Sequence, residues 1–147
     1  MYRTILVGVD GSNYAELAID TSIELAKAFG SKLVIATVHS IPALLAGRSG
    51  VIKTEIRLDH ETAKILNSML NNYAEKAKKA GVTMVETKII VTSENAGAGL
   101  VKEAEASGCA LVVIASRGLT GLKRTLLGSV AAYISEYAHC DVMIIRR

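Results

Sequence analysis

Residues 112–144, VVIASRGLTGLKRTLLGSVAAYISEYAHCDVMI, combine three features that are typical of one kind of site. A hydrophobic run ends at Ala115, a polar loop follows, and a helical pattern begins at Gly128-Ser129. The loop contains Arg117, Gly118, Gly121, Lys123 and Arg124. A buried strand that leads through such a loop to a helix N-terminus often binds phosphate, because the first N–H groups point outward and the helix dipole favours an anion.

Each part of this pattern also has an ordinary structural explanation. A Gly-Ser pair at a helix start is most often a simple cap, and loop cations are by default solvated side chains. The joint occurrence of glycines, cations and a helix start favours phosphate binding. The stretch therefore predicts an anion site at Gly128-Ser129.

Strand-like apolar runs alternate with helical patterns along the rest of the chain. We expect strands at 4–9, 32–38, 82–91, 110–115 and 142–145. We expect helices at 13–29, from beyond an irregular 40–53 loop to about 79, at 95–106 and at 129–138. The inner face of the first helix would carry Ala15, Ala18, Ile19, Ile23, Ala26 and Phe29.

This alternation predicts a single α/β domain over residues 1–147. Its fold would be Rossmann-like, with an open parallel sheet of five strands in the order 3-2-1-4-5 and helices on both faces. A closed barrel of eight such units does not fit into 147 residues.

Composition narrows the function classes. The net charge of +3 is too small and too dispersed to indicate a nucleic-acid partner. No run of eighteen apolar residues is present, and the N-terminus leads straight into the first expected strand, so we expect neither a membrane span nor a signal peptide. Cys109 and Cys140 fit a reducing cytoplasm, and the scattered histidines His39, His60 and His139 argue against a structural zinc site.

A second segment with unusual residues follows the first strand. In an open α/β sheet, ligands bind beyond the carboxyl ends of the strands where the strand order reverses. The order 3-2-1-4-5 brings Asp10-Gly11-Ser12 and the 116–127 loop to one crevice. Asp10 would accept a hydrogen bond from a ribose or a base, or hold a metal ion through water. The alternative is a turn in which Ser12 or Asn13 caps the next helix.

Catalytic motifs are missing from the sequence. Nothing matches the Walker A loop, the dinucleotide pattern G-x-G-x-x-G after the first strand, or the G-x-S-x-G nucleophile elbow. No two carboxylates are evidently placed for paired acid and base work. The residues indicate a binding site with little catalytic equipment.

The chain resembles the universal stress protein family from Tyr2 to Arg147. ILVGVDGSNYAELAID at 5–20 is similar to the family's first strand and helix, KLVIATVHS at 32–40 to its second strand, and ALVVIASRGLTGLKRTLLGSVAAYI at 110–134 to its signature. The ATP-binding branch carries Gly-x2-Gly-x9-Gly-Ser/Thr. This chain reads Ala115-x2-Gly118-x9-Gly128-Ser129, so three of the four positions match and the spacing is kept.

The resemblance implies a set of nucleotide contacts. It assigns Asp10 to the ribose and the Val38 backbone to the adenine edge, while Ile114 and Val130 would flank the base. Ala115 and Gly118 would lie at the ribose and α-phosphate. Gly128, Ser129 and the Val130 N–H would bind the outer phosphates. Arg117 would add positive charge.

Three departures from the family pattern bear on this site. Ala115 replaces the first glycine, which puts a methyl where the backbone would approach the ligand, and we expect weaker affinity. The segment Glu94-Asn95-Ala96-Gly97 differs from the usual helix start, and Ala110 replaces a common acidic residue. We expect both of these to lie outside the pocket.

The resemblance implies a cytoplasmic, homodimeric protein that binds ATP with Mg²⁺ or Mn²⁺ and acts in stress signalling or protection. The alternatives are a slow ATPase or an adenylate-transferring enzyme of similar fold, and a dimeric interaction module that binds no ATP. Gly118, Gly128 and Ser129 argue against the pure module, and the lack of a general base argues against efficient catalysis.

The last strand and the cysteines give two further expectations. In the family the C-terminal strand pairs with its copy, so we expect a homodimer through residues 142–146. Proline at Met143 or Ile145 should weaken it if that residue's N–H faces the partner. Cys109 and Cys140 precede neighbouring strands, so their side chains should lie near one another, away from the nucleotide. We expect two small buried residues, with an intramolecular disulfide as the alternative.

Overall fold

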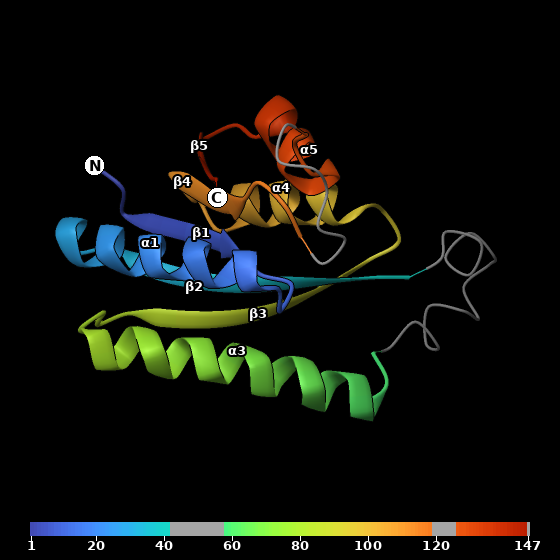
Figure 1. Cartoon of the computed structure of the whole chain (residues 1–147), viewed down its shortest axis with the longest axis horizontal. Coiled ribbons are helices and arrows are strands. Elements are labelled where there is room, and N and C mark those ends of the chain that lie inside the picture. The colour runs from blue at the N-terminus through green and yellow to red at the C-terminus, as the bar shows by residue number, and fades with distance from the viewer. Residues whose placement is uncertain (42–57, 119–125, 147) are drawn as a thin grey trace.

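Strands and helices alternate along the chain in the structure, a computed structural model that describes residues 1–41, 58–118 and 126–146. The strands are β1 (Thr4–Gly8), β2 (Lys32–Ser40), β3 (Val85–Thr92), β4 (Leu111–Ala115) and β5 (Asp141–Ile145). The helices are α1 (Asn13–Phe29), α3 (His60–Ala80), α4 (Ala96–Ala106) and α5 (Ser129–Tyr137) (Figure 1).

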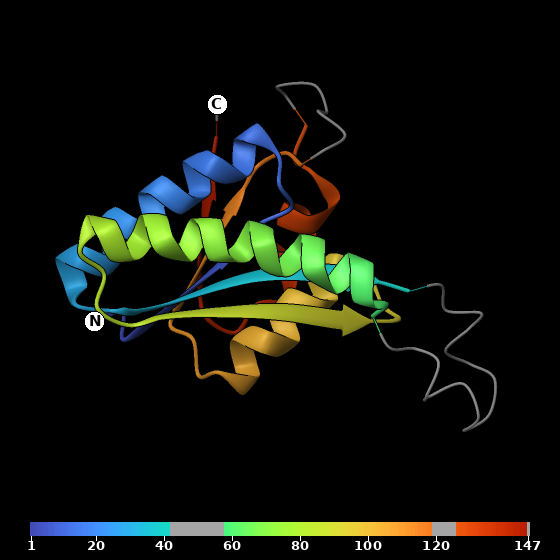
Figure 2. The same cartoon turned by 90° about the horizontal axis from the view of Figure 1, so that it is seen from below.

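The strands form one parallel sheet in the order β3-β2-β1-β4-β5. Helices α1 and α3 cover one face, and α4 and α5 cover the other (Figure 1). Figure 2 shows α1 and α3 lying across the front of the sheet. The predicted Rossmann-like α/β fold, its strand order and its helix layers are therefore confirmed. The order reverses between β1 and β4, which is where such sheets open a crevice.

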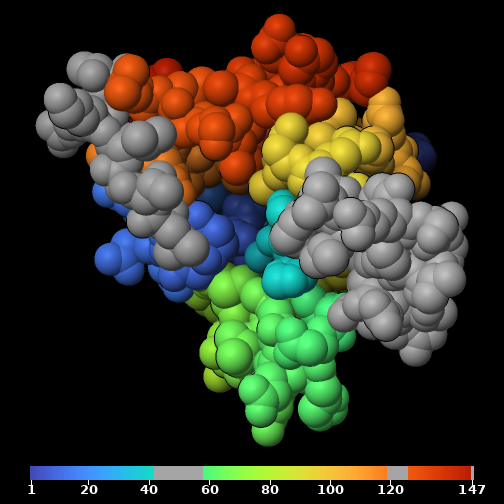
Figure 3. Space-filling view, turned by 90° about the vertical axis from the view of Figure 1, so that its right-hand side faces the viewer, coloured from blue at the N-terminus to red at the C-terminus, as the bar shows by residue number. Residues whose placement is uncertain are grey.

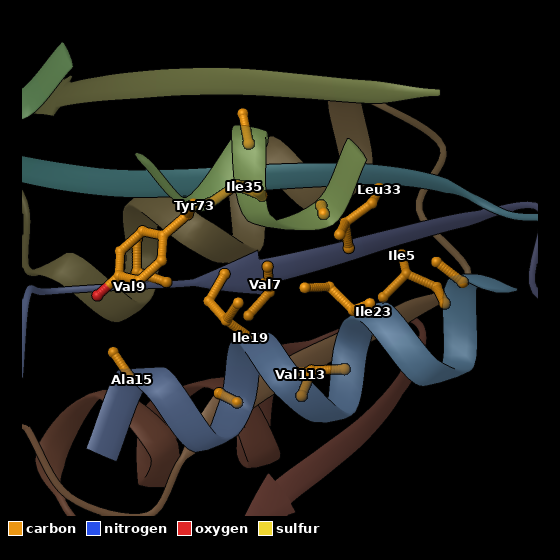
Figure 4. Close-up of a cluster of buried hydrophobic side chains, with 14 of the residues drawn as sticks. Ile5, Val7, Val9, Ala15, Ile19, Ile23, Leu33, Ile35, Tyr73 and Val113 are labelled. Carbon is orange, nitrogen blue, oxygen red and sulfur yellow. The ribbon is translucent and has the colours of Figure 1, made fainter. Parts of the chain in front are cut away.

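Helix α1 begins and ends as the sequence predicts. The Ser12 Oγ accepts a hydrogen bond from the Ala15 N–H at 3.2 Å, and Gly30 ends the helix with a φ of 64°. Between these ends, Ile19 and Ile23 are buried against the sheet, in a cluster that also holds Tyr73 of α3 (Figure 4). This cluster anchors the helix that follows β1.

Phe29 corrects one detail of that helix. Its spacing places it on the inner face of α1, but the side chain is 43% exposed. Phe29 is the last residue of α1, at the amino end of the sheet, and its ring packs edge-on against Tyr2 with the centroids 5.3 Å apart. Periodicity predicts which way a helix faces but not where the sheet beneath it ends.

Helices α4 and α5 enclose a second cluster on the opposite face. It contains Leu6, Val34, Leu100, Val112 and Ile134. A side chain at Gly97 would put its Cβ 2.7 Å from the Tyr133 Cβ, so only glycine lets the two helices approach this closely. The contact holds α5 against α4 on the face that carries the crevice.

The element boundaries differ from the expected ones at few places. β3 begins at Val85 rather than at residue 82, because the Val82 N–H donates to the Ala77 carbonyl and closes the end of α3. β2 continues to Ser40, which pairs with Thr92. The 40–53 loop from residue 42 on, and Gly121, Lys123 and Arg124, lie outside the described residues. Within the described ranges, no helix is long and apolar enough to cross a membrane.

Candidate functional site

A crevice opens at the carboxyl ends of β1, β2 and β4, where the first turns of α1, α4 and α5 meet. Figure 3 faces this end of the molecule and shows the blue, cyan, yellow and orange-red segments converging on it. Every residue that the family resemblance implicated lines this one crevice: Asp10, Val38, Ile114, Ala115, Arg117, Gly118, Gly128, Ser129 and Val130. The structure thus brings together residues from distant parts of the sequence.

Further lining residues were missed by sequence reasoning. They are Gly8, Val9, Ala15, Ala36, Ala96, Leu100 and Ala131, whereas Ser116 belongs to the loop that was expected at the crevice. Ala96 corrects the expectation that the 94–97 segment lies outside the pocket, because the connection after β3 brings the start of α4 to the crevice. Ala36 had a usable signal, since it precedes Val38 by two positions in β2 and so shares its face.

One part of the crevice is apolar. Val38 and Leu100 contribute aliphatic side chains, and Ile114 is 8% exposed. A flat apolar ring can bury its faces in such surroundings, while a few placed polar groups fix its orientation. This part of the crevice is suited to a base.

Ala115 lies differently from what the sequence suggested. Its methyl belongs to the cluster that faces α1 and α3, together with Val7 and Val113. The residue is 9% exposed although it lines the crevice. The methyl therefore packs mainly into the core beneath α1.

The Asp10 carboxylate is held between two backbone segments. Its Oδ1 accepts a hydrogen bond from the Ser12 N–H at 3.0 Å. A Cβ on Gly118 would lie 2.6 Å from its Oδ2, so the carboxylate packs directly onto the Gly118 backbone. Glycine at 118 therefore leaves room for the acid as well as for a ligand.

Gly128 makes a second close approach between backbone segments. Its N–H donates to the Ser116 carbonyl at 2.7 Å, and a Cβ at this position would lie 3.0 Å from the same oxygen. The Ser116 N–H in turn donates to the Ile145 carbonyl at 2.8 Å. Ser116 thereby joins the start of α5 to the end of β5.

The start of α5 differs from the other helix starts. Ser12, Asp59 and Asn95 each cap their helix with a side-chain oxygen. Among the helices in the described residues, α5 alone begins without a side-chain cap, at Gly128. The first N–H groups of a helix have no intrahelical partner, and its dipole is positive at this end. An anion in the crevice would accept hydrogen bonds from these N–H groups and would be attracted by the positive end of the dipole.

The side chains at the crevice give limited means of holding a metal ion. In the described parts of the chain, no group of three or more His, Cys, Asp and Glu side chains could hold one. Asp10 is the one carboxylate among the described residues that line the crevice. Mg²⁺ commonly keeps several waters and binds one or two carboxylates plus ligand phosphates. The donor set therefore fits a metal carried by a bound phosphate chain, with Asp10 in support.

The opposite end of the sheet holds the two cysteines. Cys109 and Cys140 line one small hollow, away from the crevice, and both are free thiols. Burial and the neighbouring Cys140 raise the pKa of the Cys109 thiol to about 11. The expected adjacency is confirmed, and a raised pKa makes Cys109 a poor nucleophile.

Strand β5 forms one edge of the sheet. It pairs with β4 and, within the described residues, with no other strand. Val142, Met143, Ile144 and Ile145 are each partly exposed. Natural proteins usually cover or blunt an apolar edge of this kind.

Comparisons with known proteins agree with this architecture. The model of the universal stress protein family matches residues 1–146. The universal stress protein YxiE of Bacillus subtilis is 31% identical over 153 residues, covering 99% of this chain and 100% of that protein. A putative universal stress protein of Staphylococcus haemolyticus is 31% identical over 147 residues, covering 99% and 85%. The crystal structure of a universal stress protein in complex with cAMP is 29% identical, with a TM-score of 0.74, covering 99% and 97%.

Proposed function

We propose that this chain, which belongs to the universal stress protein family, binds ATP in the crevice with Mg²⁺ or Mn²⁺. It then acts as a homodimer in nucleotide-dependent stress signalling or protection. The observation that carries the proposal is the uncapped start of α5, which opens into the crevice that the implicated residues line. The related structure with cAMP supports an adenine nucleotide as the ligand class.

The proposal gives each part of the crevice a role. The adenine lies in the apolar part, against Ile114 and Val130, with its edge at the Val38 backbone. Asp10 binds the ribose. Ala115 and Gly118 lie along the ribose and α-phosphate, while Gly128, Ser129 and the Val130 N–H bind the outer phosphates.

The metal ion would neutralise charge on the phosphate chain, with Asp10 reaching it through water. Calorimetric titration with ATP tests this arrangement. We expect binding by the wild type in Mg²⁺ and weaker binding in EDTA. Asp10→Asn should lower the affinity modestly in Mg²⁺ and less in EDTA, because the amide keeps hydrogen-bonding capacity but loses the charge. Absence of ATP binding by folded wild-type protein in Mg²⁺ and Mn²⁺ would refute the proposed function.

The proposed homodimer forms through residues 142–146, which are the end of β5 and the residue after it. The Ser116 N–H donates to the Ile145 carbonyl, so Ile145 directs its backbone groups toward β4. Successive residues of a strand alternate their direction, and Met143 therefore also faces β4. The N–H groups of Met143 and Ile145 therefore do not face a partner, and proline at these two positions does not test the dimer. Ile144, which lies between them, directs its N–H to the open edge.

Ile144→Pro is consequently the better test of the dimer. Proline at an edge position whose N–H faces away from the sheet is tolerated by the fold. We expect light scattering to find a wild-type dimer and a mostly monomeric Ile144→Pro variant with an unchanged circular dichroism spectrum. A monomeric wild type would refute the dimer, and a fully dimeric variant would move the interface away from β5.

The proposed place of action is the cytoplasm. The low cysteine content, two residues in 147, supports it, because disulfide-rich sequences are typical of oxidising compartments.

A further inference from the structure

The first turn of α1 contacts both charged side chains that line the crevice. The Ser12 N–H donates to Asp10, as described above. Two positions further along, the Tyr14 ring lies beneath the Arg117 guanidinium, whose Cζ is 5.0 Å from the ring centroid. This distance is within the range of a cation–π contact. Asp10 and Arg117 follow different strands, and the same helical turn touches both.

Both partners of the Tyr14–Arg117 contact are anchored. Tyr14 belongs to a helix whose start is capped by Ser12, and its ring packs, partly buried, against the cluster beneath α1 and α3. On the other side, the Ser116 peptide is held at its N–H by Ile145 and at its carbonyl by Gly128. The backbone that carries Arg117 is therefore fixed, and the ring restricts where the guanidinium lies.

We infer that Tyr14 is a positioning residue that holds the Arg117 guanidinium at the crevice for the phosphate chain of the ligand. The inference rests on the proposed function and extends it. Tyr14 would make the site prefer nucleotides that carry a phosphate chain over the bare nucleoside. The ring itself need not touch the ligand.

The geometry of a guanidinium explains why an aromatic ring suits this task. The group is planar, and its five N–H donors lie in its plane. One face of the group can lie on the Tyr14 ring while the N–H edges stay available for phosphate oxygens, which arginine can bind in a bidentate manner. A free arginine side chain loses considerable rotamer entropy when it binds. A ring that restricts it beforehand reduces that loss.

Titrations of ATP and adenosine into the wild type, Tyr14→Leu and Tyr14→Phe test the inference. Because an exposed cation–π contact contributes modestly, we expect Tyr14→Leu to weaken ATP binding about three- to fivefold. Adenosine binding should stay unchanged. Tyr14→Phe keeps the ring and should restore ATP binding to within about twofold of the wild type.

A double-mutant cycle with Arg117→Lys separates positioning from a general structural role. Lysine keeps the charge but lacks the planar group that stacks on the ring. Because a lysine ammonium can still contact the face of the ring, Tyr14→Leu should have a smaller effect on ATP affinity in the Arg117→Lys background than in the wild type. A loss of equal size in both backgrounds, or an equal loss for adenosine, would overturn the inference.

The remaining outcomes identify which statement fails. If the wild type binds ATP and Tyr14→Leu binds it equally well, the role of Tyr14 is refuted while the proposed function stands. If the wild type binds neither ATP nor adenosine, the proposed function fails and the role of Tyr14 fails with it. If Tyr14→Leu does not fold, Arg117→Lys serves as the test in its place. An equal loss of ATP affinity and adenosine affinity in Arg117→Lys would then overturn the inference. A loss of ATP affinity alone in Arg117→Lys, together with an unchanged ATP affinity in Tyr14→Phe, supports it.

Discussion

Helices α1 and α5 begin at the same end of the sheet, after neighbouring strands, and they begin in opposite ways. The start of α1 is capped within the protein, because the Ser12 Oγ accepts a hydrogen bond from the Ala15 N–H. α5 starts at Gly128, which has no side chain to offer, and Ser129 is exposed beside the crevice. One helix start is satisfied within the protein, and the other is available to a ligand.

The contrast teaches that position at the switch point does not by itself make a binding site. A capped start contributes stability, typically about 1 kcal/mol for a Ser cap. An uncapped start gives up that contribution and keeps N–H groups for an anion. Substitutions at α1 and α5 should therefore separate stability from binding.

Among the substitutions considered, Gly128→Val should have the largest effect, because it disturbs the start of α5 and lowers both stability and ATP binding. The added side chain would meet the Ser116 carbonyl 3.0 Å from its Cβ, so the bulk collides with the protein's own backbone as well as with the phosphates. We expect the free energy of unfolding to fall by about 1–3 kcal/mol and ATP binding to fall below detection. Urea unfolding and calorimetry measure the two effects. A folded variant with wild-type ATP affinity would contradict the account.

Ser129→Ala should affect binding and spare the fold. The hydroxyl is exposed and does not cap α5, so unfolding should change little. Losing a hydrogen bond to a charged phosphate costs about 1.5–3 kcal/mol, which weakens ATP binding about ten- to a hundredfold. Unchanged ATP affinity would remove Ser129 from the site.

Ser12→Ala is the matched control at α1. It removes the same hydroxyl from the capped start, and we expect a loss of about 1 kcal/mol in stability. ATP affinity should stay within about twofold, since a helix cap is not a ligand contact. If Ser12→Ala weakened ATP as much as Ser129→Ala, the contrast between the two helix starts would be wrong.

Ala115→Gly should have the smallest effect on binding. The Ala115 methyl packs into the cluster beneath α1, so its removal should cost about 1 kcal/mol of stability. ATP affinity should stay within about twofold of the wild type. Clearly tighter binding would show instead that the methyl crowds the ligand, as the family pattern suggested.

Much of the fold was predictable from the sequence because its signals are local. The run at β4 is buried throughout, and glycines end α1 and α3. Because consecutive strands usually lie side by side and crossovers between parallel strands are right-handed, such runs leave few topologies to choose from. Phe29 was misplaced because helical spacing contains no information about where the sheet stops.

Residue patterns alone indicated Asp10 and the Gly128-Ser129 helix start, and the family signature added the other predicted residues of the crevice. The contacts within the site were not predictable from either. Ala96 reaches the crevice because of how the chain crosses to α4. The need for glycine at 128 comes from the Ser116 carbonyl, and Arg117 contacts the ring of Tyr14 in α1. These are contacts between distant segments, which residue patterns do not encode.

Amide resonances of isotope-labelled protein, followed by NMR during titration with ATP and Mg²⁺, test the central claim most directly. The account predicts the largest shifts at Gly118, Ser129 and Val130, around the uncapped start of α5. The amides of Cys109 and Cys140, at the opposite end of the sheet, should stay in place. Shifts that are absent at α5, or that gather around the cysteines, would contradict it.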